Sequence, residues 1–519
     1  MARTRLPKSL TEPAIESPIP FRTGCNGEFL PAPPTERDLR AEALFERVSD
    51  EKARRLGVSR REFVGGACGT ATALWVINAV YGCGGDAGLR GDSTSGSTSG
   101  DGSGGAASGG GSGGDGGVYQ VDAGSTEDVC KAHEELSGDD FIFDVQTHHV
   151  NPTGPWRNSP SALTWGLFFA ALPQGLCGEA DPLECFSKNH YLREMFVNSD
   201  THVAALSAVP ADPGANPLTV EEAEATRDIV QTLSGSPRVV LHGLVMPDRG
   251  QAELDKMQAL AEETKISAWK VYTPYGSWRL DDEAVGIPFI ERARSLGIKV
   301  ICTHKGLPLV GFDPAFCAPD DVGVVAKAYS DVSFLVYHSA FDPIVPEGPY
   351  NPAAPNAGID RLIRTLEDNA IGPGGNVYAE LGSLWRHFMT NPMQAAHAIG
   401  KLLKHVGEDR IVWGTDSIWY GSPQDQIAAF RRFQIPEPLR DQHGYPEITP
   451  AIRAKIFGLN AATAYGIDPK ATLCTITEDD LAKAKLASAD RIAPGFRGYG
   501  PQTRREMLDF LRSRGGEPG

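Results

Sequence analysis

The sequence predicts a (β/α)8 barrel, and three observations support this prediction. From about residue 126 onward, short runs of β-branched and aliphatic residues alternate with helical patterns. Such runs are typical of parallel strands that are covered on both faces. Six of them end in a polar residue, at the edge where a barrel of this kind carries its catalytic groups. The pattern therefore predicts an enzyme.

The elements follow in a regular order. We expect strands over Phe141–His148, His202–Val209, Arg238–Met246, Ile266–Tyr272, Lys299–His304, Val332–His338, Asn376–Leu381 and Ile411–Asp416. We expect helices over Thr219–Leu233, Gln251–Glu263, Ile287–Leu296, Ile359–Asn369, Pro392–Val406 and Pro450–Tyr465. Eight strands with helices between them close as a barrel more readily than they form an open sheet. No Gly-rich phosphate loop follows the first strand, which argues against a dinucleotide-binding fold.

Composition narrows the class of protein. The chain has 519 residues, of which 41% are hydrophobic, so it can bury a full core. Its formal net charge of −17 argues against nucleic acid and against an anionic membrane surface as partners of the folded domain. The expected partner is a small-molecule substrate, and a homo-oligomer is compatible with the sequence.

The chain ahead of the barrel divides into three segments. Residues 1–58 are Pro-rich and without periodicity, and we expect a disordered leader. In residues 59–83, Ser59, Arg60, Arg61 and Phe63 precede a modest apolar stretch, and this layout resembles a twin-arginine (Tat) export signal. An internal helix with a basic start and a single membrane anchor are the alternatives. Residues 84–125 form a Gly/Ser-rich linker.

These segments favour export through the Tat machinery to the periplasm or the cell envelope. Val80 to Cys83 looks like a lipobox, so a lipid anchor at Cys83 is the only membrane contact that we expect. The barrel then spans residues 126–469, and residues 470–519 form a helical C-terminal tail. Cys177 and Cys185 flank a short loop and could form a disulfide in an oxidising compartment, although their spacing alone leaves this open.

Histidine and carboxylate residues at the strand ends suggest a metal site. His148, His304 and Asp416 come from different strands, and their convergence would suit a zinc-class ion that keeps one open position. Taken alone, Asp416 could instead cap the next helix. His338 ends the strand FLVYH, where it could be a ligand, an electrophile that polarises the substrate, or a core histidine bonded to a backbone carbonyl.

Together these residues resemble the amidohydrolase superfamily, and most closely its amidohydrolase-related, ACMS-decarboxylase-like branch. Asp144, His148, His304, His338 and Asp416 match the pattern of that family position by position, and WGTDS and GLNAATAYG are similar to its motifs. The resemblance implies one divalent metal ion, expected to be zinc, with Asp416 and His338 as catalytic residues. The metal ligands would be His148, His304, Asp416 and Gln146.

Gln146 departs from the family pattern, which has histidine at this position. An amide oxygen is a weaker ligand than imidazole for a zinc-like ion, so the site could also have lost its metal. Strand alternation places Gln146 and His148 on one face and His149 on the other.

Further residues are expected to bind the substrate: Lys270, Tyr272, Glu380 and Trp419. Some family members carboxylate a lysine placed like Lys270 so that it bridges two metals. A substrate carboxylate or Glu380 could equally pair with its charge. We favour a single metal with Lys270 as a substrate anchor. The segment 151–200 is too long for an ordinary connection and reads as a lid or a specificity insert.

The predicted function is a metal-dependent hydrolase that acts on an amide, ester or lactone bond of a small organic acid. A metal-dependent, non-oxidative decarboxylase of an aromatic or unsaturated acid is the first alternative. The second is a degenerate barrel that has lost catalysis through Gln146 and binds a ligand.

Overall fold

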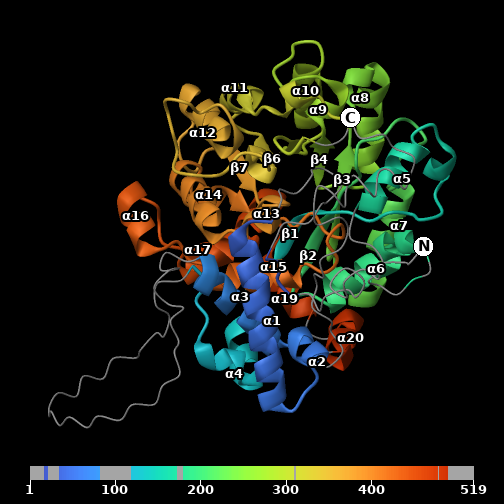
Figure 1. Cartoon of the computed structure of the whole chain (residues 1–519). Coiled ribbons are helices and arrows are strands. Elements are labelled where there is room, and N and C mark those ends of the chain that lie inside the picture. Colours follow the sequence, from blue (N-terminus) through green and yellow to red (C-terminus); the bar gives the residue numbers. More distant parts are fainter. Residues whose placement is uncertain are drawn as a thin grey trace, which may run out of the picture.

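The computed structural model describes residues 17–21, 34–81, 118–171, 179, 181–308, 311–476 and 479–488. Its centre is a ring of parallel strands inside a layer of helices (Figure 1), which confirms the predicted barrel. The strands are β1 (Phe143–Thr147), β2 (Val203–Leu206), β3 (Val239–Leu244), β4 (Ala268–Val271), β5 (Val300–His304), β6 (Ser333–Tyr337), β7 (Val377–Glu380) and β8 (Ile411–Val412).

The strands pair in chain order, and the chain beyond β8 closes the ring. Thr147 pairs with Ser417 as a parallel bridge, and the amide of Asp416 donates to the carbonyl of Gln146 at 2.9 Å. The register between β1 and β2 shifts between Asp144 and Thr147, so an irregularity lies directly before the mouth of the barrel.

Apart from α11, the helices of the barrel lie within one or two residues of the predicted ranges. They are α7 (Val220–Ser234), α8 (Gln251–Glu262), α10 (Gly286–Ser295), α11 (Asp320–Ala328), α12 (Gly358–Asp368) and α14 (Pro392–His405). Local sequence explains their ends: Thr219 caps α7 by accepting from the amide of Glu222, and Gly235 ends it in the left-handed region at φ 64°. The sequence patterns did not indicate α11.

Shorter helices fill the loops and the end of the chain. They are α5 (Ala162–Ala171), α6 (Lys188–Leu192), α9 (Thr273–Gly276), α13 (Leu384–Phe388), α15 (Gln424–Arg432), α16 (Glu437–His443), α17 (Pro450–Ala454), α18 (Asn460–Tyr465), α19 (Pro469–Ile476) and α20 (Asp480–Ser488). The buried ion pair Arg238–Asp479, at 3.0 Å, fastens the start of β3 to the residue before α20. Cys185 is disulfide-bonded, while Cys177 lies outside the described residues.

Residues 34–81, which the sequence indicated as leader and signal, are helical in the structure. They form α1 (Glu36–Leu56), α2 (Arg60–Gly65) and α3 (Ala67–Tyr81), which lie beside α4 (Val129–Leu136) at the lower side of the barrel (Figure 1). A disordered leader is therefore not what the structure shows for this part. The arrangement matches the alternative of an internal helix with a basic start.

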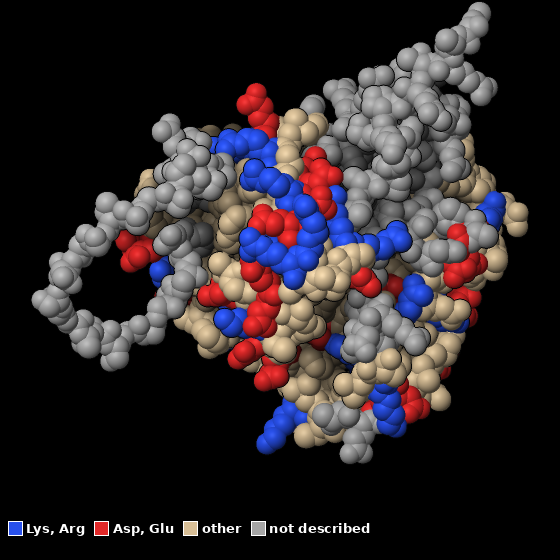
Figure 2. All heavy atoms as spheres, turned by 60° about the horizontal axis from the view of Figure 1, so that its bottom comes forward, with Lys and Arg blue, Asp and Glu red and all other residues tan. Residues whose placement is uncertain are grey.

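Contacts on two sides hold these helices to the domain. α3 buries Leu74 and Ile77 completely, and Asn78 both accepts from the amide of Tyr119, at 2.8 Å, and donates to its carbonyl. Lys52 pairs with Glu127 at 2.7 Å, and Arg60 with Glu46 at 3.2 Å. Figure 2, which brings the lower end of Figure 1 forward, shows basic and acidic side chains interleaved there. The apolar residues of α3 are thus buried within the fold rather than exposed to water.

Two of our N-terminal predictions are not tested by these contacts. Cys83, the residue predicted to carry a lipid, and the Gly/Ser-rich stretch after it lie outside the described residues. Within the part of the chain that is described, no helix is both long and apolar enough to span a bilayer.

Candidate active site

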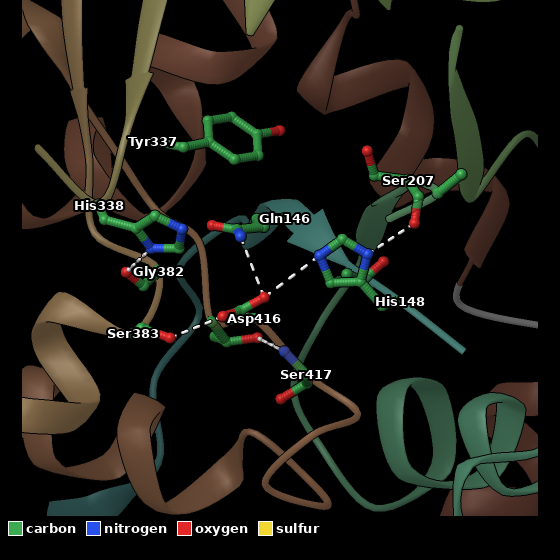
Figure 3. Close-up of polar contacts among 12 residues, drawn as sticks. Gln146, His148, Ser207, Tyr337, His338, Gly382, Ser383, Asp416 and Ser417 are labelled. Carbon is green, nitrogen blue, oxygen red and sulfur yellow. Dashed lines mark hydrogen bonds and ion pairs between the residues drawn. The ribbon is translucent and has the colours of Figure 1, made fainter. Parts of the chain in front are cut away.

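The carboxyl ends of the strands gather six of the predicted site residues at one mouth, and all are buried. They are Gln146, His148, His304, His338, Glu380 and Asp416. Figure 3 shows Gln146 and His148 pointing from β1 toward Asp416, with His338 across from them. His149 points the other way and bonds the hydroxyl of Thr226 on α7 at 2.8 Å, as strand alternation predicts.

Asp416 is the centre of this arrangement (Figure 3). Its Oδ1 accepts from Gln146 Nε2 at 3.0 Å and lies 3.2 Å from His148 Nε2, and its Oδ2 accepts from Ser383 Oγ at 2.6 Å. Burial acts to raise the pKa of Asp416, but the hydrogen bond and charge of His148 outweigh it and lower that pKa to about 2. Asp416 is therefore an ionised carboxylate at neutral pH.

The three histidines of the mouth share one arrangement. One nitrogen of each ring lies within hydrogen-bond distance of a backbone carbonyl: His148 Nδ1 of Ser207 (2.6 Å), His304 Nε2 of Leu307 (2.9 Å) and His338 Nδ1 of Gly382 (2.8 Å). A carbonyl only accepts, so these nitrogens donate. In the neutral rings of His304 and His338, the other nitrogen then carries a lone pair. Burial lowers the pKa of His304, and that of His338 to about 4, which keeps both rings neutral.

This donor set fits a divalent cation in its chemistry. Backbone hydrogen bonds that fix the tautomer are typical of metal-binding histidines. The facing atoms His148 Nε2 and Asp416 Oδ1 attract each other only through a proton or a cation. The buried Oε1 of Gln146 has no hydrogen-bond donor among the described residues. Among the residues that the structure describes, however, no three His, Cys, Asp or Glu side chains stand together closely enough to hold an ion. Binding would therefore require side chains to move toward the His148–Asp416 pair.

Two carboxylates near the mouth bind backbone groups. Glu380 accepts from the amides of His338 (2.8 Å) and Gly382 (2.5 Å), and burial raises its pKa to about 8. Asp144 accepts from the amides of Gln146 and Thr415, each at 3.1 Å, and burial raises its pKa to about 7. Both therefore orient the loops that carry the site. The predicted contact of Glu380 with substrate stays a prediction.

Lys270 lies inside the barrel and has no exposed surface. Its Nζ is 3.2 Å from the ring centroid of Tyr337 and 4.7 Å from that of Tyr272, and it has no hydrogen-bond acceptor among the described residues. Burial lowers its pKa to about 7. Tyr272 stacks on His304 at 5.6 Å and donates its hydroxyl to the carbonyl of Ala208. The structure thus places Lys270 beneath aromatic rings, and its role as substrate anchor remains a prediction.

An aromatic cluster covers one side of the mouth. The ring of Trp419 stacks on His148 with centroids 5.3 Å apart and an interplanar angle of 10°. The insert between β1 and β2 supplies Phe169 and Phe186, whose rings lie 6.0 and 5.9 Å from Trp419. We call these three side chains the aromatic wall. It places the insert against the site, where a lid or specificity element was expected.

Sequence reasoning missed Ser383, whereas it placed Tyr420 among the aromatic residues that line the pocket. Ser383 donates to Asp416, and its Oγ lies 2.9 Å from the Tyr420 hydroxyl. Serine is common in loops, so the available signal for Ser383 was its position three residues after Glu380, where β7 ends.

No curated protein matches the chain. Among solved structures, it is similar to an uncharacterised TIM-barrel protein from Bordetella bronchiseptica, at 14% identity and a TM-score of 0.42, over 63% of this chain and all of that one. It is also similar to 5-carboxyvanillate decarboxylase from Sphingomonas paucimobilis (12% identity, TM-score 0.40, 63% and 99% of the two chains). The same enzyme from Novosphingobium aromaticivorans, solved with bound manganese, gives 12% identity and a TM-score of 0.39 over 63% and 98%.

The chain also matches a protein family. The family described as amidohydrolase matches residues 178–467, which is more than half of the chain. The matched range begins in the insert after β1 and continues through β8 to the helix that follows it. The chain belongs to the amidohydrolase family.

Proposed function

We propose that the protein is a metal-dependent hydrolase that acts on an amide, ester or lactone bond of a small organic acid. The observation that carries this proposal is the ionised Asp416 in contact with His148 at the mouth of the barrel. Neutral histidines with free lone pairs surround it. This combination offers a proton acceptor beside a set of cation ligands.

Asp416 is the proton acceptor in the proposed reaction. When bound, a divalent cation would lower the pKa of a water molecule at the site. Asp416 would accept the proton of the attacking water through Oδ1, the oxygen that faces His148 and Gln146, while Ser383 holds Oδ2. The cation would be held by His148, His304, His338 and Asp416, with the Gln146 amide oxygen as a weaker ligand.

The assignment of His338 differs from the one that the sequence suggested. We expected His338 to stabilise a developing oxyanion, which requires a proton to donate. Its Nδ1 donates to Gly382 and its pKa lies near 4, so Nε2 of the neutral ring carries no proton. We therefore assign His338 as a ligand rather than as an oxyanion donor.

Metal content of the full chain tests the proposal. We expect about one zinc-class or manganese-class ion per chain by mass spectrometry, and its loss in His304→Ala. His397→Ala is the matched control, since His397 lies on α14 and bonds the hydroxyl of Tyr445. Hydrolysis of a panel of lactones, esters and amides should then require the metal. A folded protein that binds no ion, even with added zinc or manganese, would contradict the proposal and leave the binding-protein alternative.

Decarboxylation is a second candidate, favoured by the aromatic wall. Trp419 stacked on His148 offers a flat, apolar surface suited to an aromatic or unsaturated acid. Release of carbon dioxide from carboxylated aromatics, without a hydrolysis product, would identify this reaction. Release that persists in His304→Ala would exclude it as an activity of the site.

We also propose export to the periplasm or the cell envelope. The support is the Ser59 to Phe63 motif and the apolar segment after it. Arg60→Lys together with Arg61→Lys should retain the protein in the cytoplasm, as measured by fractionation. An unchanged distribution would contradict recognition of the twin arginines.

A further inference from the structure

A chain of two hydroxyl groups ends on the carboxylate of Asp416. Ser383 Oγ lies 2.6 Å from Asp416 Oδ2 and 2.9 Å from the Tyr420 hydroxyl. The Ser383 hydroxyl donates its single proton to Asp416 Oδ2. The Tyr420 hydroxyl must then donate to Ser383. The direction of the chain is therefore fixed: Tyr420 to Ser383 to Asp416.

The chain joins two loops and is closed to water. Ser383 belongs to the loop after β7, while Tyr420 and Asp416 belong to the loop after β8. Their exposed fractions are 3%, 7% and 2%, so water would not readily replace a lost hydroxyl. Tyr420 is itself supported by the guanidinium of Arg386, 5.3 Å from its ring centroid.

The backbone of Ser383 adopts a conformation that is unfavourable for a residue with a side chain. Its φ of 53° lies in the left-handed region, which a residue with a Cβ adopts rarely. A conformation of this kind persists where the surroundings enforce it, and it is frequent at active sites. The one contact that depends on this side chain is the hydroxyl between Tyr420 and Asp416.

We infer that Ser383 and Tyr420 are positioning residues that hold Asp416 Oδ2, so that Oδ1 faces His148 and Gln146. The inference rests on the proposed role of Asp416 as proton acceptor and deepens it. Without the chain, the carboxylate is free to rotate about its Cβ–Cγ bond, and both of its oxygens compete for His148. Hydrogen bonds behind a ligand or base typically change metal affinity or activity by about 10- to 100-fold.

The test uses Ser383→Gly, Tyr420→Phe and the double variant of the full chain. Glycine suits the left-handed backbone, so Ser383→Gly removes the hydroxyl without adding backbone strain. We expect its kcat and its affinity for zinc to fall about 10- to 100-fold, with KM changed less than about twofold. Tyr420→Phe should give a smaller loss of about three- to tenfold, in line with one neutral hydrogen bond.

The double variant separates positioning from general damage. In the proposed chain the Tyr420 hydroxyl reaches Asp416 through Ser383, so Tyr420→Phe should lower kcat no further in the Ser383→Gly background. Multiplicative losses would overturn the inference. Tyr445→Phe is the control, since it also removes a tyrosine hydroxyl, one bonded to His397 on α14, and should change neither kcat nor metal affinity.

Crystal structures of both single variants decide the matter even if the proposed reaction is wrong. We expect the Asp416 carboxylate to rotate, so that the contact of 3.2 Å between His148 Nε2 and Oδ1 is lost or divided between two conformers. An unmoved carboxylate in both variants would overturn the inference. Failure of the proposed function would show separately, as an absence of metal and turnover in the unmodified protein.

Discussion

Replacing Lys270 by methionine should stabilise the protein. The lysine is fully buried, and its ammonium has no hydrogen-bond acceptor in the described part of the chain. Methionine keeps most of the volume of the side chain and removes the charge. Replacing a buried charge by a well-packed apolar group often stabilises a protein by about 1–4 kcal/mol.

The pKa gives the magnitude and the sign. Burial lowers the pKa of Lys270 from 10.5 to about 7, and each unit corresponds to about 1.4 kcal/mol, so the upper limit is about 4–5 kcal/mol. Between these two pKa values the unfolded chain holds a proton that the folded chain has lost, so stability rises with pH across this window. The gain from Lys270→Met should therefore be about 2–4 kcal/mol at pH 7 and below about 1 kcal/mol at pH 10.

Urea unfolding followed by tryptophan fluorescence measures this difference at both values of pH. Lys305→Met is the matched control. Lys305 is equally buried, but its Nζ lies 2.8 Å from the carboxylate of Asp321, which has no exposed surface. Removing Lys305 leaves that carboxylate unpaired, so this variant should lose about 3–5 kcal/mol. Two buried lysines should thus change stability in opposite directions.

One result would refute the reasoning. If Lys270→Met destabilises the protein as Lys305→Met does, the ammonium of Lys270 has a partner that offsets its burial. A gain that does not shrink between pH 7 and pH 10 would show that packing, rather than the charge, causes the effect.

Three further predictions concern single contacts. Gly414→Ala should lower stability by about 1–3 kcal/mol and abolish activity. The new Cβ would overlap Oε1 of Glu380 and displace the carboxylate that holds the loop of His338. Thermal unfolding and turnover measure the two effects, and a variant of full activity would contradict this prediction. Arg238→Met should lower the free energy of unfolding by about 3–5 kcal/mol, because Asp479 stays buried without its partner. Urea unfolding measures this loss, and a value below about 1 kcal/mol would show that the ion pair contributes little to stability. Gln146→His should raise the affinity for zinc at least about tenfold, since imidazole replaces a weak amide ligand. Competition with a chromophoric chelator measures this affinity. An unchanged value would place residue 146 outside the metal site.

The strands and most helices of the barrel were predictable from sequence, because buried positions require apolar residues and these form recognisable patterns. Strands buried on both faces leave runs such as those of β5 and β6, and helices such as α12 repeat apolar residues on one face. α11 escaped detection because it is only nine residues long and contains Gly323, and so short a stretch gives a weak periodic signal. Strand periodicity also placed Gln146 and His148 toward Asp416 and His149 away from it.

The geometry of the loops could not be predicted in the same way. The hydrogen bond from Ser383 to Asp416 depends on a left-handed residue and joins positions 33 residues apart. No periodic pattern records such a contact. The helical state of residues 67–81 is a related case: an apolar run indicates that a segment avoids water, but not whether a membrane or its own domain covers it.

The packing of α3 has a consequence for the newly made chain. This helix ends at Tyr81 and contacts α14, which begins at Pro392, so about 310 residues are synthesised between the helix and part of the surface that covers it. At about 5–20 residues per second, that interval lasts roughly 15 to 60 s. During this time the apolar segment that follows Arg60 and Arg61 is accessible to any factor that binds it at the ribosome. Completion of the barrel then buries the segment, so the proposed export requires that recognition come before α14 packs against α3.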